Sequence, residues 1–192
     1  MKTTLAFVCA AALSQVAFAQ SVVNGDFSLE VPGNSTGNGW TGFSNDGAGG
    51  WRSSGGNPGG YFIMNDGGAS ATDPSISQTI NGFVPGGLYR LTGDFASWIV
   101  SNAPFGGASF AVDINGTQVF TGLAGTLQEW RSFQVDFTAP DTGIVTIRFR
   151  AEINGTDNDF AIDNIAVAAI PTPATGAGLL GLSLLAMGRR RR

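Results

Sequence analysis

Hydrophobic and polar residues alternate one by one in short runs through most of this chain. Such alternation places one set of side chains on each face of a β-strand, so each run is predicted to have a buried face and an exposed face. Three runs show the pattern most clearly. Their inward positions are Tyr89, Leu91 and Phe95 in the first run, Phe133, Val135 and Phe137 in the second, and Val145, Ile147 and Phe149 in the third.

Runs of this kind are separated by Gly, Pro, Asn and Asp, and no stretch of about 12 residues has a helical period. The sequence therefore predicts an all-β antiparallel sandwich. Between Val31 and Gly60 it predicts a long glycine-rich loop with Trp40, Phe43 and Trp51 as its apolar anchors. The predicted strands are Ser21–Ser28, Tyr61–Met64, Ser75–Ile80, Leu88–Val100, Ala108–Ile114, Gln118–Leu123, Trp130–Thr138, Gly143–Ala151 and Asp159–Ala169.

Two local features refine these strands. Asn115-Gly116 joins two of the runs, and because both residues tolerate positive φ, the pair predicts a hairpin turn. In the last run, Phe160 and Ile162 share one parity whereas Ile165 and Val167 share the other. This change of parity predicts a β-bulge at Asp163-Asn164.

The first 19 residues resemble a secretory signal peptide. Lys2 precedes an apolar stretch, and Ala17-Phe18-Ala19 has the small residues that signal peptidase requires, so cleavage is expected after Ala19. Cys9, the single cysteine, would leave with this leader, and the mature protein would have no disulfide. The 20–170 segment is long enough for one domain with a proper core.

The last 22 residues have three parts in a fixed order: a proline-rich spacer, an uncharged apolar segment and an arginine cluster. This order resembles the PEP-CTERM sorting signal, an exosortase substrate of Gram-negative bacteria that is held transiently in the inner membrane by a C-terminal apolar helix. Thr172 stands where that family usually has glutamate, and a plain tail anchor is the alternative. The residues that carry the signal are Pro171, Thr172, Pro173, Arg189, Arg190, Arg191 and Arg192.

Charge and composition narrow the function. Without leader and tail, five arginines face 14 acidic residues, and such an acidic surface does not suit nucleic acid. The chain has no histidine, which excludes Ser-His and Cys-His catalysis. Paired carboxylates, as in glycoside hydrolases, are the remaining catalytic chemistry, and Glu30, Glu129 and Glu152 are available for it without forming a recognisable motif. We therefore expect a protein that is not an enzyme.

Four motifs of the body, in order, resemble the galactose-binding-like jelly rolls that include many carbohydrate-binding modules. They are Val22–Phe27, Ile76–Ile80 with Pro85-Gly86, Trp130 before Phe137-Thr138, and Phe160–Ile165. The resemblance implies a structural calcium ion, for which Asp26, Glu30 and Asp163 are the candidate ligands. In the alternative reading, Asp26 and Asp163 accept hydrogen bonds from the amides of a turn and a bulge.

Sugar binding requires aromatic platforms and planar polar side chains. Trp98 is the leading candidate because a large aromatic residue falls on the polar parity of its run; the alternative is that it packs under the glycine-rich loop. Trp130 is expected to be structural. The full candidate sugar face comprises Trp98, Arg90, Asp94, Asp113, Gln134, Arg148, Trp40, Trp51 and Tyr61.

The resulting expectation is an exported, non-catalytic protein of the outer surface or extracellular matrix that associates with extracellular polysaccharide, as in biofilms or flocs. Signal peptidase and an exosortase would be its partners during export. A purely structural or adhesive coat protein is the first alternative, and a carboxylate-dependent glycoside hydrolase is the second.

Overall fold

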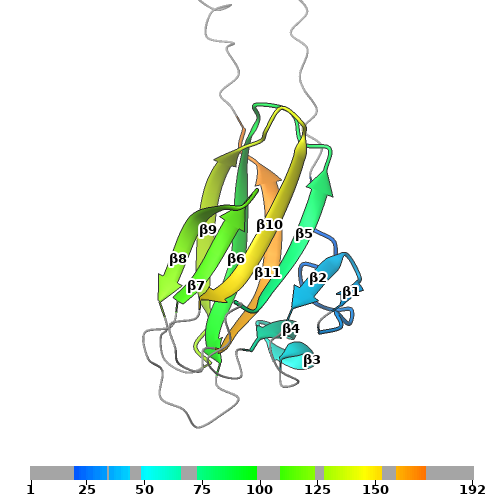
Figure 1. Ribbon diagram of the computed structural model, residues 1–192, viewed down its shortest axis with the longest axis vertical. Helices are drawn as coiled ribbons and strands as arrows, with labels where there is room; N and C mark the ends of the chain where they lie inside the picture. The colour runs from blue at the N-terminus through cyan, green and yellow to red at the C-terminus, as the bar shows by residue number, and fades with distance from the viewer. Residues whose placement is uncertain are drawn as a thin grey trace, which may run out of the picture.

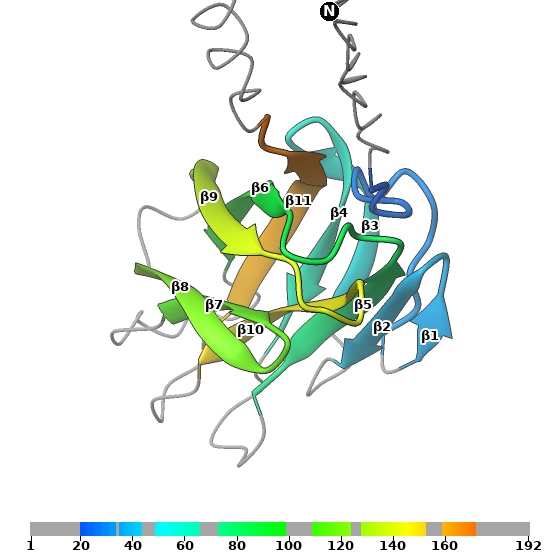
Figure 2. The same cartoon turned by 90° about the horizontal axis from the view of Figure 1, so that it is seen from above.

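The computed structural model describes residues 20–33, 35–43, 49–65, 73–98, 109–123, 128–152 and 159–171. All regular secondary structure in these ranges is β, arranged in two antiparallel sheets that pack face to face (Figures 1 and 2). The predicted all-β sandwich is therefore confirmed, and its order of strands is that of a jelly roll.

Sheet A has six strands and sheet B has five. In sheet A the order is β1 (Thr36–Gly37), β2 (Trp40–Phe43), β5 (Ser75–Asn81), β10 (Ile144–Glu152), β7 (Ser109–Ile114) and β8 (Thr117–Leu123). In sheet B the order is β3 (Gly50–Gly56), β4 (Gly59–Met64), β11 (Asp159–Ala169), β6 (Leu88–Trp98) and β9 (Arg131–Thr138).

The core lies between the inner faces of the two sheets and is rich in phenylalanine. Phe110 of β7 stacks on Phe149 of β10 within sheet A, with ring centroids 6.0 Å apart, and on Phe95 of sheet B at 4.7 Å. Because the inner positions of β6, β9 and β10 are the apolar positions of the alternating runs, the predicted inward faces are confirmed. Every residue named for those faces is buried.

The two predicted local features are also present. Asn115 and Gly116 have φ of 50° and 79° and connect β7 to β8. The register of β11 against β6 shifts between Asp163 and Ala166, with Asn164 at φ 54°, as the change of parity indicated. Ile165 donates its amide hydrogen to the carbonyl of Gly25, so the bulge also fixes the N-terminal segment.

The first 60 residues were predicted less well. Ser21–Ser28 is not a strand, because the Asn24 side chain bonds the amide and the carbonyl of Leu29 and closes a turn. The predicted glycine-rich loop from Val31 to Gly60 contains β1, β2 and β3. Its glycines allow positive φ and close backbone packing without preventing sheet pairing; an added Cβ at Gly60 would lie 2.1 Å from the carbonyl oxygen of Phe27.

The predicted signal peptide, with Ala17 and Ala19, lies outside the described residues. So does the predicted sorting tail beyond Pro171, including its apolar helix. Among the described residues, no helix has the length and hydropathy to span a membrane.

Candidate functional site

The structure separates the predicted sugar-binding residues into three groups. Trp40 and Trp51 belong to the first, which serves the core. Trp40 is fully buried, stacks on Phe27 at 5.4 Å and donates its indole N–H to the carbonyl of Asn24. Trp51 packs against the same core and donates to the carbonyl of Phe27. Full burial leaves no face of Trp40 for a sugar, whereas Trp51 is only partly buried and stays a candidate platform.

The second group lies on the outer face of sheet B. The rings of Tyr61 and Trp98 are tilted by 45° with centroids 4.7 Å apart, and Trp130 meets Tyr61 edge-on at 5.9 Å. The three rings pack in one small cluster that includes the small residue Ala161. We call Tyr61, Trp98 and Trp130 the aromatic plate. Trp98 and Trp130 thus both pack on Tyr61 of β4, and the expectation that Trp130 is structural stays a prediction. Burial raises the pKa of Tyr61.

The same outer face carries three more of the predicted residues on the paired strands β6 and β9: Arg90, Asp94 and Gln134. Register places Arg90 opposite Asp136, Thr92 opposite Gln134, and Asp94 opposite Ser132. Arg90 donates two hydrogen bonds to Asp136, at 2.7 and 2.8 Å, which raise the pKa of Arg90 and lower that of Asp136. Beside them lies a hollow of about 430 Å³. Thr92, Asp94, Ser132, Gln134 and Asn164 supply its polar lining.

Asp163 is buried in the bulge of β11, and its carboxylate accepts backbone amides. Asn57 donates to Oδ2 at 2.6 Å and Asn164 to Oδ1 at 2.7 Å. Burial raises the pKa of Asp163 to about 6 despite these hydrogen bonds, and the nearby charges of Asp94 and Asp26 raise it further. Gly56 is required here, since an added Cβ would lie 2.7 Å from Oδ2.

The predicted calcium ligands do not form a three-carboxylate site. Asp26 accepts the amide of Ser28 at 3.2 Å, and Glu30 is exposed. In the part of the chain that the structure describes, no three His, Cys, Asp or Glu side chains are grouped to hold a metal ion. Asp26 and Asp163 therefore fit the alternative interpretation, in which their carboxylates accept hydrogen bonds from backbone amides. A bound calcium ion stays a prediction.

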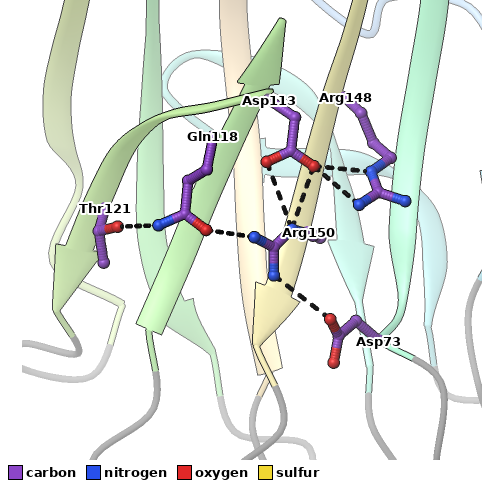
Figure 3. Close-up of polar contacts among 6 residues, drawn as sticks. All are labelled: Asp73, Asp113, Gln118, Thr121, Arg148 and Arg150. Atoms are coloured by element: carbon purple, nitrogen blue, oxygen red, sulfur yellow. Dashed lines mark hydrogen bonds and ion pairs between the residues drawn. The ribbon is translucent and has the colours of Figure 1, made fainter. Parts of the chain in front are cut away.

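The third group, Asp113 and Arg148, lies on the outer face of sheet A at the centre of a charged network (Figure 3). Arg148 binds Oδ2 of Asp113 through Nε at 2.9 Å and Nη2 at 2.7 Å. Arg150 binds the same oxygen at 3.1 Å. The Asp113 side chain is only 3% exposed, whereas that of Arg148 is 48% exposed. Nη1 of Arg148 makes no hydrogen bond to any described residue.

Arg150 extends this network to both sides, and its side chain is 13% exposed. It contacts Asp73 at 3.3 Å and the amide oxygen of Gln118, and Gln118 in turn donates to Thr121 at 2.7 Å. The sequence analysis missed Arg150, Gln118 and Asp73. Arg148 and Arg150 share the polar parity of their run, and that signal was sufficient to find Arg150.

Register arranges the outer face of sheet A in two rows that cross five strands. One row contains Thr41, Ser77, Arg148, Asp113 and Gln118. The other contains Phe43, Ser75, Arg150, Ala111 and Thr121. At a strand spacing of about 4.8 Å, each row is about 19 Å long. Phe43 is 39% exposed, so it presents an aromatic ring to solvent at one end. We call this surface face A.

Of the acids considered for catalysis, Glu30 and Glu129 are not among the residues that line the hollow. Glu30 is exposed in the segment before β1, and Glu129 is an exposed side chain 3.7 Å from Arg131. The side chain of Glu152 lies outside the described residues. No catalytic pair of these glutamates is described, and the expectation that the protein is not an enzyme remains untested.

Comparisons with known proteins agree with the fold. No family model matches the chain, and no curated protein matches it. Among solved structures, a family 61 carbohydrate-binding module in complex with β-1,4-galactotriose matches with a TM-score of 0.56 and 15% identity, covering 79% of this chain and 99% of the module. A putative sugar binding protein from Bacteroides thetaiotaomicron matches with a TM-score of 0.53 and 12% identity, covering 79% and 100% of the two chains.

A tandem of two family 22 modules from Paenibacillus barcinonensis Xyn10C also matches, with a TM-score of 0.54 and 13% identity. The match covers 86% of this chain and 49% of the tandem. At these identities the likeness concerns the fold alone. The protein is thus a jelly-roll sandwich of the type found in carbohydrate-binding modules.

Proposed function

We propose that the protein is an exported, non-catalytic polysaccharide-binding protein and that face A holds the glycan. The observation that carries the proposal is the Arg148–Asp113–Arg150 network, exposed through Arg148 on a hydroxyl-rich face that ends in Phe43. The neighbouring structures support it by their fold, since several are named as carbohydrate-binding modules.

Face A supplies the two kinds of contact that a sugar needs. Arg148 has a free guanidinium nitrogen, and the hydroxyls of Ser75 and Ser77 have no partner among the described residues, so these groups can bond to sugar hydroxyls. Phe43 offers its ring to the apolar face of a pyranose. Asp113 holds Arg148 and is itself held by Arg150, so little side-chain entropy of Arg148 is lost on binding.

The setting is an extracellular one. The leader with Ala17 and Ala19, and the tail with its Arg189–Arg192 cluster, support export followed by exosortase-type sorting to the outer surface or matrix. There the protein would associate with extracellular polysaccharide in a biofilm or floc. Mass spectrometry of the mature chain from its native host tests the sorting: an end near Pro171 to Pro173 agrees with cleavage, whereas a chain that retains Arg192 contradicts it.

Binding is tested by a glycan array followed by affinity electrophoresis of the full chain in gels that contain the soluble polysaccharides retained on the array. Phe43→Ala and Arg148→Ala should each weaken binding about tenfold, which corresponds to about 1.4 kcal/mol. Leu88→Ala and Arg131→Ala are matched controls, because both side chains are exposed and lie outside face A. Wild-type protein that binds no glycan would favour the structural or adhesive coat protein.

A further inference from the structure

We propose a second glycan site on the outer face of sheet B, formed by the polar hollow and the aromatic plate. The two outer faces lie on opposite sides of the sandwich (Figure 2). A single chain would then bind two polysaccharide strands and cross-link them. This inference rests on the proposed function, because it adds a second site to the glycan binding of face A.

On the outer face, β11 carries small residues next to the β6–β9 pair that lines the hollow. Ala166 lies opposite Thr92, and Ala168 lies opposite Arg90, and both alanines are exposed. The outer face of β11 is therefore low beside β6 at these two positions. The polar groups of Thr92, Gln134 and Asn164 surround the space that remains.

The polar lining is held in position by hydrogen bonds from several elements. Asp94 accepts Ser132 Oγ at 2.7 Å and Asn164 Nδ2 at 2.9 Å. Asn57, from the turn between β3 and β4, also donates to Asp94, at 3.2 Å. Because the carboxylate is fixed by groups from three elements, its orientation toward the hollow is set before any ligand arrives.

The aromatic plate lies next to this hollow along the strands. Trp130 is two residues before Ser132 on the β9 side, and Trp98 is four residues after Asp94 on β6. The stretch of β6 from Arg90 to Trp98 spans about 26 Å at roughly 3.3 Å per residue. A glycan following β6 would meet the carboxylate and amides in the hollow and a half-buried tryptophan beyond it. Neutral or weakly charged sugars suit this surface, since Arg90 is paired with Asp136.

The test is isothermal titration of the full chain with β-1,4-galactotriose, cellotriose and xylotriose, combined with light scattering of the corresponding long polysaccharides. Gln134→Ala removes a hydrogen-bonding group of the hollow, and Thr92→Leu places a larger apolar side chain in its lining. Ala168→Ile is the control: it enlarges an exposed side chain on the same outer face, outside the lining of the hollow. Phe43→Ala and Arg148→Ala report on face A.

We expect two molecules of trisaccharide per chain. One should be lost in the face A variants and the other in Gln134→Ala and Thr92→Leu. Scattering by the cross-linked polysaccharide should be abolished in either set and retained in Ala168→Ile. A single binding event that only the face A variants remove overturns the second site and leaves the proposed function intact. A single event that only the sheet B variants remove overturns the assignment to face A. Absence of all binding overturns both.

Discussion

The two outer faces of the sandwich each carry an arginine–aspartate pair, and the pairs differ in burial. On face A, Asp113 is 3% exposed and is shared by Arg148 and Arg150. On sheet B, the side chains of Arg90 and Asp136 are 41% and 45% exposed, although their two hydrogen bonds, at 2.7 and 2.8 Å, are as short as those of Arg148. Removing one partner of a buried pair leaves an uncompensated charge, whereas water replaces a partner at the surface. The stability lost when a pair is broken is therefore expected to follow the burial of the pair and not the length of its hydrogen bonds.

The largest effect is expected for Asp113→Ala, which removes the buried carboxylate that Arg148 and Arg150 share. We expect the free energy of unfolding to fall by about 3–5 kcal/mol, the usual range for breaking a buried pair. Urea denaturation monitored by tryptophan fluorescence would measure it. A midpoint equal to that of the wild type would mean that the network is not a structural unit.

The second prediction concerns pH and Asp163 in calcium-free buffer. Its pKa is about 6 in the folded protein against 3.8 for the unfolded chain, so the folded state binds more protons between these values. Stability should therefore fall as pH rises from about 4 to about 6, by roughly 2–3 kcal/mol in all, and this contribution should be constant outside that window.

Urea midpoints across this pH window check the prediction, with Asp163→Asn as the comparison. The asparagine variant should show no decrease attributable to this group, and stability that rises through the window in the wild type would contradict the assignment. Calcium added above pH 6 should leave the midpoint unchanged if amides alone hold Asp163. A marked stabilisation would instead support the calcium prediction.

A smaller effect is expected for Arg148→Lys on face A. Lysine keeps the charge but cannot reproduce the fork of donors that reaches Asp113 while presenting a further nitrogen to the ligand. We expect glycan affinity to fall about fivefold, or roughly 1 kcal/mol, with little change in the urea midpoint. Calorimetry measures the affinity. Equal affinities of Arg148→Lys and the wild type would indicate that only the positive charge at this position matters.

The smallest effect is expected for Asp136→Ala on sheet B. Solvent competes for Arg90, so the urea midpoint should not change measurably even though two hydrogen bonds are lost. A loss as large as that of Asp113→Ala would remove the distinction between the two faces.

Much of the fold was predictable because parity along a strand is a local property. The alternation around Phe133, Val135 and Phe137 located an inner face, and the parity change at Asp163-Asn164 located a bulge. The strands between Val31 and Gly60 were not predictable in this way. They are short and rich in glycine, and tertiary pairing rather than local hydrophobic pattern holds them in the sheets.

The candidate sites were predicted only in part, because parity shows that a residue faces outward from its own sheet but not which sheet it belongs to. Arg148 and Gln134 are both on polar parity, yet strand order places them on opposite sides of the molecule. Trp40 and Trp51 were selected as aromatic residues in a predicted loop. Their burial depends on contacts with Phe27 and Asn24, which are distant in the sequence.

The most direct test of the account is nuclear magnetic resonance of the arginine Nε–H and tryptophan indole N–H signals during titration with the best-binding oligosaccharide from the array. Arg148 and Arg150 report on face A, Trp98 and Trp130 on the aromatic plate, and the buried indole of Trp40 serves as an internal reference. The account predicts saturable shifts of Arg148 and Arg150 with Trp40 unchanged. Saturable binding that leaves both arginine signals in place would contradict the assignment of the glycan to face A.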